Sequence, residues 1–362
     1  MKLFPGTNSR NGFALIIVML AIFILASMAA YLAFAMKVET KLAITANDNQ
    51  KMIWLARSAV EEARWGLAQE KMVPAQPYTA LNQWWATGVA GPLETNSVLV
   101  GVPQAIQLGG GSATYKITDL ERYANINVAT APLLQQALTV MGVDADEVSV
   151  VSDSIQDWVQ SGDVPRVAGA KNDFYQSLDP PYNCKEAPID DMSELLLVRG
   201  IADDPAIYYG GSPPNMPASR FQHQLGFAGS QEGQPPQYPF GLKDVFTPFS
   251  TGQININTAD ADTLQIIPGM DTNSAAAIMQ YRAGPSGDEA GADATPFQNP
   301  GQVSAAGISP VAAAAISRYC TTTSSTFKVT VTATIGQDTR TFYAILFQAG
   351  RNIEVVDFYW DE

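Results

Sequence analysis

An uncharged apolar run near the N-terminus constrains the fold of this chain more than any other feature. Residues 13–36 are 24 positions without a charge, and the polar segment before them carries Lys2 and Arg10 but no acid. At 1.5 Å per residue, a helix of this length spans about 36 Å, enough to cross a bilayer with some tilt. The run therefore predicts one membrane-spanning helix.

Three kinds of targeting segment contain such a run: a signal anchor, a secretory signal peptide and a prepilin leader. The apolar region of a secretory signal peptide is normally about 7–15 residues, which is shorter than this run. A prepilin peptidase cuts after a glycine at the border between the polar and apolar segments. Gly12 occupies that border behind the basic residues, so we expect cleavage of the leader, residues 1–12, to free Phe13 as the new N-terminus.

The helix is expected to continue far beyond the membrane. No proline occurs between Pro5 and Pro74. Apolar residues recur at steps of three or four, at positions 52, 56, 59, 63 and 67. This spacing predicts one helix of roughly 55–60 residues, embedded in the membrane first and packed on a soluble domain afterwards. The basic leader and the acidic remainder predict a cytoplasmic N-terminus with the bulk outside.

Charge and cysteine content limit the partners and the cross-links. The net charge is −14, which disfavours nucleic acid and leaves basic partners or divalent cations open. The chain has two cysteines, Cys184 and Cys320. In an exported domain they are either a disulfide or two separate buried thiols.

Beyond the helix, short strand-like runs at 97–102 and 113–118 precede a helical, acidic region with helices at 132–140 and 146–160. Residues 208–252 are rich in Gly, Pro, Gln and Ser and are expected to be a long surface excursion. The C-terminal region alternates apolar and polar residues from Phe327 onward, which predicts an antiparallel meander of three strands.

A short motif occurs twice. Residues 125–129 read Asn-Ile-Asn-Val-Ala, and residues 255–259 read Asn-Ile-Asn-Thr-Ala. Each copy leads into helical sequence, and Pro268-Gly269 separates the two helices that follow the second copy. This arrangement predicts a helix-hairpin-helix-like unit, with Thr258 or Asn257 as the N-cap of its first helix.

Several stretches together resemble the general secretion pathway protein K family, the large minor pseudopilins of type II secretion systems. The resemblance covers most of the chain but not the excursion 208–240. The stretches are the leader and long helix at 12–67, acidic segments at 154–158, 163–166, 169–170, 173–175 and 178–179, a leucine-rich turn at 194–201, Ile254, Asn255, Ile256, Asn257, Thr258 and Ala259 with Pro268 and Gly269, and the aromatic residues 358–360.

The resemblance implies an α+β fold, in which a pilin-like long N-terminal helix packs on a small antiparallel sheet and a large, mostly helical domain is inserted. We expect the helix at 13–72, the first part of the pilin-like β domain at 73–118, the inserted domain at 119–320 and the completing meander at 321–362. The inserted domain would contain two helix-hairpin-helix-like units and the loop 208–252.

The family resemblance also implies function and partners. Members act as minor pseudopilins at the tip of the periplasmic pseudopilus and initiate its assembly for protein export across the outer membrane. The implied partners are the I- and J-type minor pseudopilins, the major pseudopilin, the prepilin peptidase and the inner-membrane assembly platform. The new N-terminus would be methylated, with the chain anchored by a single pass in the inner membrane and its bulk periplasmic.

Ile17, the fifth residue after the expected cleavage, fits a tip position. Most pilin-like subunits have a glutamate there that pairs with the terminal amine of a neighbour, and K-type members share its absence. A lone carboxylate in hydrocarbon is costly, whereas Ile17 needs no partner. A subunit with nothing beyond it has no amine to pair with.

Bound calcium is a further implication of the resemblance. Calcium takes six to eight oxygen ligands, and we expect them from Asp157, Asp163 and Asp173 in the acidic loop region. The alternative is a solvated acidic helix face. One departure from the family pattern is Lys171, which stands where an acid is frequent.

Other classes of function are disfavoured. His223 is the only histidine, and no nucleophile elbow, zinc motif or phosphate-binding loop is present. We therefore expect no enzyme activity. A membrane-anchored DNA receptor is a rival, but residues 119–160 and 253–283 carry net charges of −6 and −2, which repel phosphate. A minor pilin of a type IV pilus, acting in adhesion or assembly initiation, remains the structural alternative.

Overall fold

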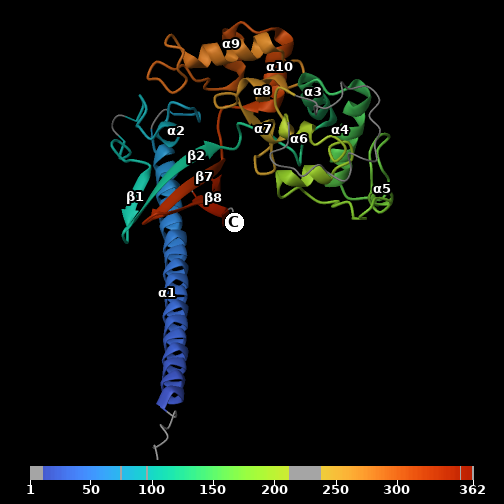
Figure 1. The fold of residues 1–362 in the computed structure, drawn as a ribbon. Coiled ribbons are helices and arrows are strands. Elements are labelled where there is room, and N and C mark those ends of the chain that lie inside the picture. Colours follow the sequence, from blue (N-terminus) through green and yellow to red (C-terminus); the bar gives the residue numbers. More distant parts are fainter. Residues whose placement is uncertain (1–10, 74–75, 95–96, 212–237, 351, 361–362) are drawn as a thin grey trace, which may run out of the picture.

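The computed structural model describes residues 11–73, 76–94, 97–211, 238–350 and 352–360. Its main feature is α1 (Asn11–Glu70), a single helix of 60 residues. By length and composition this helix can cross a membrane. The predicted continuous helix is confirmed, and Figure 1 shows its first half projecting from the body as a stem.

An antiparallel sheet packs on the second half of α1. Its five strands lie in the order β1-β2-β7-β8-β9. They are β1 (Ala105–Leu108), β2 (Gly111–Asp119), β7 (Thr326–Ile335), β8 (Asp338–Ala349) and β9 (Asn352–Trp360). Val329, Val331 and Ala333 on β7 are fully buried, as are Ala56 and Ala63 on α1. The apolar residues that alternate in β7 and recur at helical spacing in α1 therefore pack into one core. The predicted α+β fold class and the C-terminal meander are confirmed.

The strand predicted at residues 97–102 is wrong. This segment is a series of turns in which Ser97 Oγ accepts a hydrogen bond from Leu99 N at 3.1 Å. Leu99 is fully buried in the core and Val102 packs against it, while Val98 and Val100 are exposed. The edge strand starts later, at Ala105, because local side-chain-to-backbone bonding competes with strand pairing here.

The inserted domain consists of two units with the same order of elements. Each unit begins and ends with a two-residue strand, and the two strands pair in parallel. The first unit contains β3 (Ala124–Asn125), α3 (Ala131–Met141), α4 (Ala145–Val159), α5 (Asn172–Tyr175), η1 (Met192–Leu197), α6 (Ala206–Tyr209), α7 (Leu242–Val245) and β4 (Phe246–Thr247). The second contains β5 (Ile254–Asn255), α8 (Ala261–Gln265), α9 (Thr272–Ala283), η3 (Pro300–Ala306), α10 (Pro310–Tyr319) and β6 (Cys320–Thr321).

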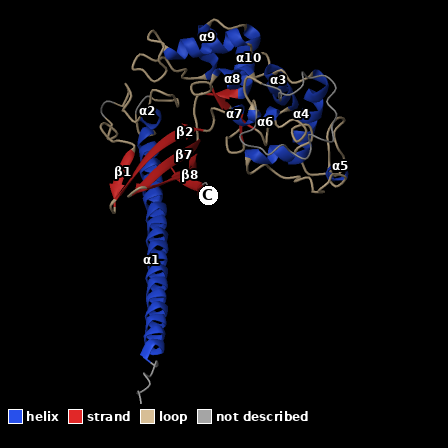
Figure 2. Ribbon diagram, viewed as in Figure 1, coloured by secondary structure: helices blue, strands red, loops and turns tan. Residues whose placement is uncertain are grey.

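Both units turn between their first two helices at a glycine. Gly142 and Gly269 each have φ of 90°, a left-handed conformation that favours glycine. The helix-hairpin-helix-like prediction at Pro268-Gly269 is therefore confirmed as a turn between α8 and α9. Figure 2 shows that the regular structure of this domain is mainly helical and is joined by long loops, in contrast to the sheet around the stem.

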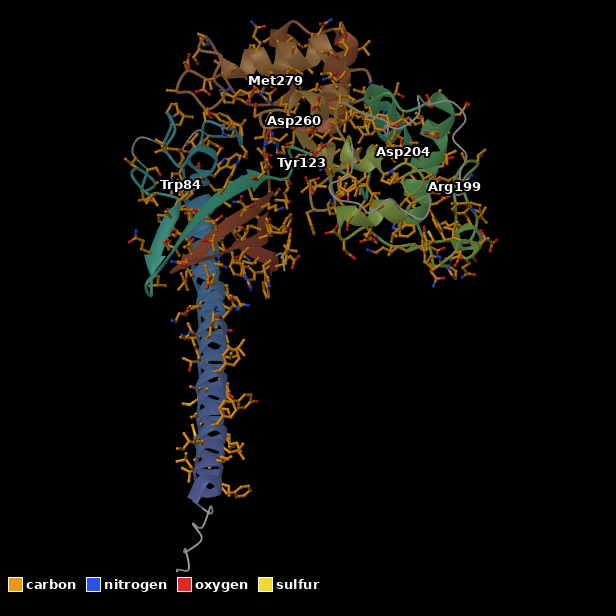
Figure 3. All side chains as sticks on the ribbon, viewed as in Figure 1. Trp84, Tyr123, Arg199, Asp204, Asp260 and Met279 are labelled. Carbon is orange, nitrogen blue, oxygen red and sulfur yellow. The ribbon has the colours of Figure 1, made fainter. Side chains whose placement is uncertain are left out.

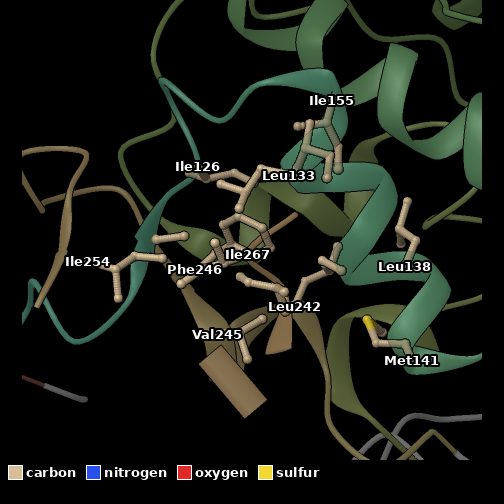
Figure 4. Close-up of a cluster of buried hydrophobic side chains, with 14 of the residues drawn as sticks. Ile126, Leu133, Leu138, Met141, Ile155, Leu242, Val245, Phe246, Ile254 and Ile267 are labelled. Atoms are coloured by element: carbon tan, nitrogen blue, oxygen red, sulfur yellow. The ribbon is translucent and has the colours of Figure 1, made fainter. Parts of the chain in front are cut away.

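The two units share one hydrophobic core. Ile126 and Phe246 come from the first unit, and Ile254 and Ile267 from the second, and all four are buried in the same cluster (Figure 4). The sheet and α1 form a separate cluster that includes Trp84 and Phe342. Because the cores are distinct, the orientation of the inserted domain on the stem depends on the segments that join them.

Candidate functional site

A buried polar junction joins the sheet to the inserted domain. Its centre is Asp119, the last residue of β2, which is 1% exposed. Asp119 Oδ1 accepts from Glu121 N at 2.8 Å. Asp119 Oδ2 accepts from Thr258 Oγ1 at 2.5 Å and from Ser324 Oγ at 2.7 Å. Hydroxyls from two distant segments thus meet on one carboxylate, which fixes their relative position.

Asn255 completes the junction. Its Nδ2 donates to Ser324 Oγ at 2.7 Å, to Thr79 O at 3.0 Å and to Asp119 Oδ2 at 3.1 Å. The side chain is fully buried. One amide therefore links the loop that follows α1, the end of β2, the start of the second unit and the return to β7. Figure 3 labels Tyr123 and Asp260 in this region between the sheet and the helices.

The predicted N-cap at Thr258 or Asn257 is wrong. Asp260 caps α8, because its side chain accepts from Thr263 N at 2.8 Å. Thr258 instead bonds Asp119, and Ala259 is fully buried behind it. An Asp closer to the helix start is a better cap, which leaves the threonine hydroxyl free for the junction.

The second asparagine of each motif holds a distant segment. Asn257 Oδ1 accepts from Phe297 N at 2.8 Å, and its Nδ2 donates to Phe297 O at 2.9 Å. In the first unit, Asn127 makes the same two bonds with Ile189, at 2.6 and 3.0 Å. The repeated motif therefore reflects a repeated structure. In each unit the asparagine amide bonds both the backbone N–H and the C=O of one distant residue, as a neighbouring strand would.

Burial and charge shift the ionisation of the junction. Burial raises the pKa of Asp119, while the hydroxyls of Thr258 and Ser324 limit the rise. Burial and the nearby Asp119 raise the pKa of Glu121 to about 7. Glu121 accepts from the backbone and hydroxyl of Thr326 at 2.9 and 3.1 Å. Glu121 is therefore the carboxyl of the junction whose pKa lies near neutral pH.

The three predicted calcium ligands are not brought together. Asp157 is buried at the end of α4, and its Oδ2 accepts from Arg166 N at 2.9 Å. Asp163 and Asp173 are both exposed, the second of them on α5. In the described ranges, no group of three or more His, Cys, Asp or Glu side chains is placed to hold a metal ion. The residues of this loop do not fit the expected site.

Lys171 places its ammonium group beside Asp157, in the loop where calcium was expected. Its side chain is 6% exposed, and Nζ donates to Asp157 O at 2.7 Å and to Gln160 O. Glu186 Oε1 lies 3.9 Å away. These carbonyls end α4, where a cation is favoured by the helix dipole. The ammonium therefore satisfies oxygens at this helix end.

The cysteines are free and buried in the structure. Cys320 lies on β6 beside Ile254, whereas Cys184 Sγ contacts Asp157 O at 3.6 Å. The sequence left open a disulfide or two separate buried thiols, and the structure has two separate thiols. Burial raises the pKa of Cys184, which keeps this thiol protonated and unreactive.

The predicted processing site lies at the start of α1. Gly12 falls within the helix, and Phe13 and Ile17 are 71% and 54% exposed along it. Residues 1–10 of the leader and His223 lie outside the described residues. Cleavage after Gly12 and the role of Ile17 remain predictions.

Sequence reasoning missed Asp119, Ser324 and Thr79. Two of them are in polar runs that look like ordinary turns, so their burial could not be read from their neighbours. The one available signal was Asp119, a carboxylate directly after the apolar alternation of β2. An acid at a strand end facing a core needs partners.

A long helix packed on an antiparallel meander, with a helical domain inserted between its strands, defines a pilin-like subunit with an elaborated head. Comparison with known proteins gives the family. Residues 113–208 match the family model described as type II secretion system (T2SS), protein K. This match supports the resemblance to the type II secretion protein K family over residues 113–208.

Curated relatives and a solved structure agree. The putative type II secretion system protein K of Escherichia coli (strain K12) is 23% identical over 211 residues, covering 54% of this chain and 60% of that protein. Protein K of Pectobacterium carotovorum subsp. carotovorum is 23% identical over 204 residues, with the same coverage. The matched region thus spans about 60% of the length of each curated relative.

The fold matches a chain in the crystal structure of the GspK-GspI-GspJ complex from the enterotoxigenic Escherichia coli type 2 secretion system. The TM-score is 0.61 at 17% identity, covering 88% of this chain and 98% of that chain. At this identity the likeness concerns the fold, including the inserted domain.

Proposed function

We propose that this chain is a minor pseudopilin of a type II secretion system, placed at the tip of the pseudopilus. In this role it initiates assembly with I- and J-type minor pseudopilins, and the finished pseudopilus supports protein export across the outer membrane. The solved relative is part of a GspK-GspI-GspJ complex, which supports the choice of partners. The major pseudopilin, the prepilin peptidase and the inner-membrane assembly platform are the further partners.

The observation that carries the proposal is the position of the inserted domain. It lies at the end of the body away from the membrane half of α1 and extends to one side (Figure 1). Pilin-like subunits stack through their long helices, so a subunit above this one would meet the inserted domain. This bulk supports a place at the end of the filament.

Ile17 supports the same position for an electrostatic reason. An internal subunit gains from a carboxylate that pairs with the terminal amine of its neighbour, whereas an apolar side chain in hydrocarbon needs no partner. Cleavage between Gly12 and Phe13, followed by methylation, would produce the mature N-terminus. The single helix would then anchor the chain in the inner membrane, with a cytoplasmic N-terminus and a periplasmic bulk.

Two alternatives from other classes fit less well. DNA binding by the helical hairpins is disfavoured because Asn255 and Thr258 are fully buried and bonded to protein atoms, and the surrounding charge is negative. A minor pilin of a type IV pilus would share the stem, but the protein K domain match favours secretion. No catalytic role is proposed for the chain.

Two experiments test the proposal. Deleting the chain in its host should abolish export of the secreted proteins and leave pili unchanged, and the full chain supplied in trans should restore export. Normal export without the chain would overturn the proposal, and loss of pili alone would favour the pilin alternative. Mass spectrometry of the mature protein from membranes should find Phe13 as its first residue.

A further inference from the structure

Two buried carboxyl groups meet where α1 ends. Glu70, the last residue of α1, is 8% exposed, and Glu94 is fully buried. Trp85 N donates to Glu70 Oε1 at 3.2 Å. The preceding amide, Trp84 N, donates to Glu94 Oε2 at 3.1 Å, and Figure 3 labels Trp84 beside the upper end of α1. Because adjacent amides bind one carboxyl group each, the two side chains lie together and share a hydrogen bond.

The hydrogen-bond donors assign different charge states to the two groups. Glu94 Oε2 also accepts from Gly91 N, and Glu94 Oε1 accepts from Gln76 Nε2 at 3.4 Å. Both oxygens of Glu94 therefore have donors, as a carboxylate requires. Glu70 Oε2 is buried without a donor among the described residues. A charged oxygen in that position is costly, whereas a protonated one donates its own hydrogen bond to Glu94.

The surrounding charges also favour the protonated form of Glu70. Burial, the hydrogen bond with Glu94 and the charge of Glu94 raise the pKa of Glu70 to about 10. Lys71 and Tyr78 line the cavity beside Glu70. Burial and the charge of Glu94 raise the pKa of Tyr78. Burial lowers the pKa of Lys71, and the charge of Glu121 opposes this more than that of Glu70 does. The nearby cation thus interacts more with Glu121, which leaves a proton to neutralise Glu70.

The loop that carries Glu94 also holds the inserted domain. This loop, residues 76–94, contains Thr79. Thr79 Oγ1 accepts from Ser324 N at 3.1 Å, and Thr79 O accepts from Asn255 Nδ2 in the buried junction at 3.0 Å. A change in how the loop packs on α1 therefore reaches the contact between the sheet and the inserted domain.

We propose that Glu70 and Glu94 share one proton that fastens the loop at 76–94 to the end of α1, and that loss of this proton at alkaline pH releases the loop. Release places both carboxyl groups in water, where each is ionised at neutral pH. Opening therefore liberates one proton, and a rise in pH favours the open form. Because Thr79 lies in the same loop, opening loosens the inserted domain on the sheet. The proposal does not depend on the proposed function.

Hydrogen exchange of the full chain in detergent, followed by mass spectrometry of peptides from the loop at 76–94, measures this opening. The closed form binds one more proton than the open form, so its stability is present at low pH and is lost as pH rises. The useful range is about pH 7.5 to 9, above the pKa of Glu121, which is about 7. There the protection of the loop, corrected for intrinsic exchange, should fall about 10-fold for each pH unit.

Glu70→Gln is the deciding variant. Its amide oxygen can accept from Trp85 N, and its NH₂ group is a permanent donor to Glu94. The loop should stay protected in this variant, and its protection should no longer depend on pH in the same range. Glu94→Gln removes the charged acceptor of two backbone N–H groups and should lower protection several-fold. The matched control is Glu61→Gln, at an exposed position of α1, which should keep the wild-type slope.

Infrared spectroscopy observes the shared proton directly. At about pH 8, the wild-type chain should show a carboxylic acid C=O stretch that the Glu70→Gln variant lacks. Any contribution from Asp119 cancels in this difference, because both chains contain it. The proposal is overturned if the band is missing from the difference spectrum, if the wild-type protection does not depend on pH, or if Glu61→Gln removes the slope. It also fails if Glu70→Gln does not fold or is less protected than the wild type, because Glu70 would then be an ionised partner of Lys71.

Discussion

Replacing Asn255 with alanine tests the claim that one buried amide joins the stem to the inserted domain. The variant removes three donor contacts, to Thr79 O, Asp119 Oδ2 and Ser324 Oγ, and one acceptor for Asn257 N. The cavity left behind is small, so the main loss is hydrogen bonding to groups that stay buried.

The size of the effect follows from the kinds of bond. A bond to a charged acceptor contributes about 1.5–3 kcal/mol and a neutral one about 0.5–1.5 kcal/mol. Losing one bond to Asp119 and the neutral bonds around it predicts a fall of about 3–5 kcal/mol in the free energy of unfolding. Urea unfolding of the full chain in detergent measures this fall.

The repeated motif provides a matched control. Asn125 holds the equivalent position in the first unit, but its Nδ2 donates only to the backbone oxygens of Pro248 and Ser250. Without a charged acceptor, Asn125→Ala should cost about 1–2 kcal/mol. A double-mutant cycle between Asn255→Ala and Asp119→Asn should then show a coupling of at least about 1 kcal/mol. Equal losses in the two asparagine variants, together with no coupling, would refute the reasoning.

Four shorter predictions concern other parts of the chain. Because the pKa of Glu121 is raised to about 7, folding stability should fall as pH rises from about 4.5 to 7, by up to about 3 kcal/mol, and Glu121→Gln should flatten this pH profile of urea unfolding. Lys171→Met leaves the carbonyl oxygens at the end of α4 without their donor and should cost about 1–3 kcal/mol in the same assay; an unchanged midpoint would show that the ammonium is not needed. Gly12→Trp should block leader cleavage, seen as an unprocessed mass and lost export, and normal processing would contradict the predicted site. Ile17→Glu should impair initiation of the pseudopilus, measured by recovery of the tip complex, and unchanged recovery would show that this position does not mark the tip.

The elements with strong periodicity could be predicted from the sequence. The 60-residue helix followed from an uninterrupted apolar run and from spacing at positions 52–67. The meander followed from strict alternation in β7. These patterns work because each reflects contact of one face with one core. The strand prediction at 97–102 failed because the serine side chain in this segment hydrogen-bonds a nearby backbone N–H, which favours turns over strand pairing.

The junction and the metal ligands were harder because they depend on residues far apart in the chain. Asp119 and Ser324 are separated by 205 positions, and no local pattern indicates that they meet. The expected ligands Asp157, Asp163 and Asp173 rest on the family resemblance and its acidic loop, but the structure does not bring them together.

The sheet closes as if the inserted domain were a tight turn. Asp119, the last residue of β2, pairs with Phe327 in β7, and Leu120 N still donates to Thr326 O at 2.9 Å. The chain therefore leaves and returns at one rung of the ladder, and the two parallel strand pairs of the insertion bring its own ends close together. The strands β2 and β7 therefore pair as a hairpin would pair them, although about 200 residues lie between them. A head attached in this way can be enlarged, replaced or lost in evolution without changing the register of the strands below it.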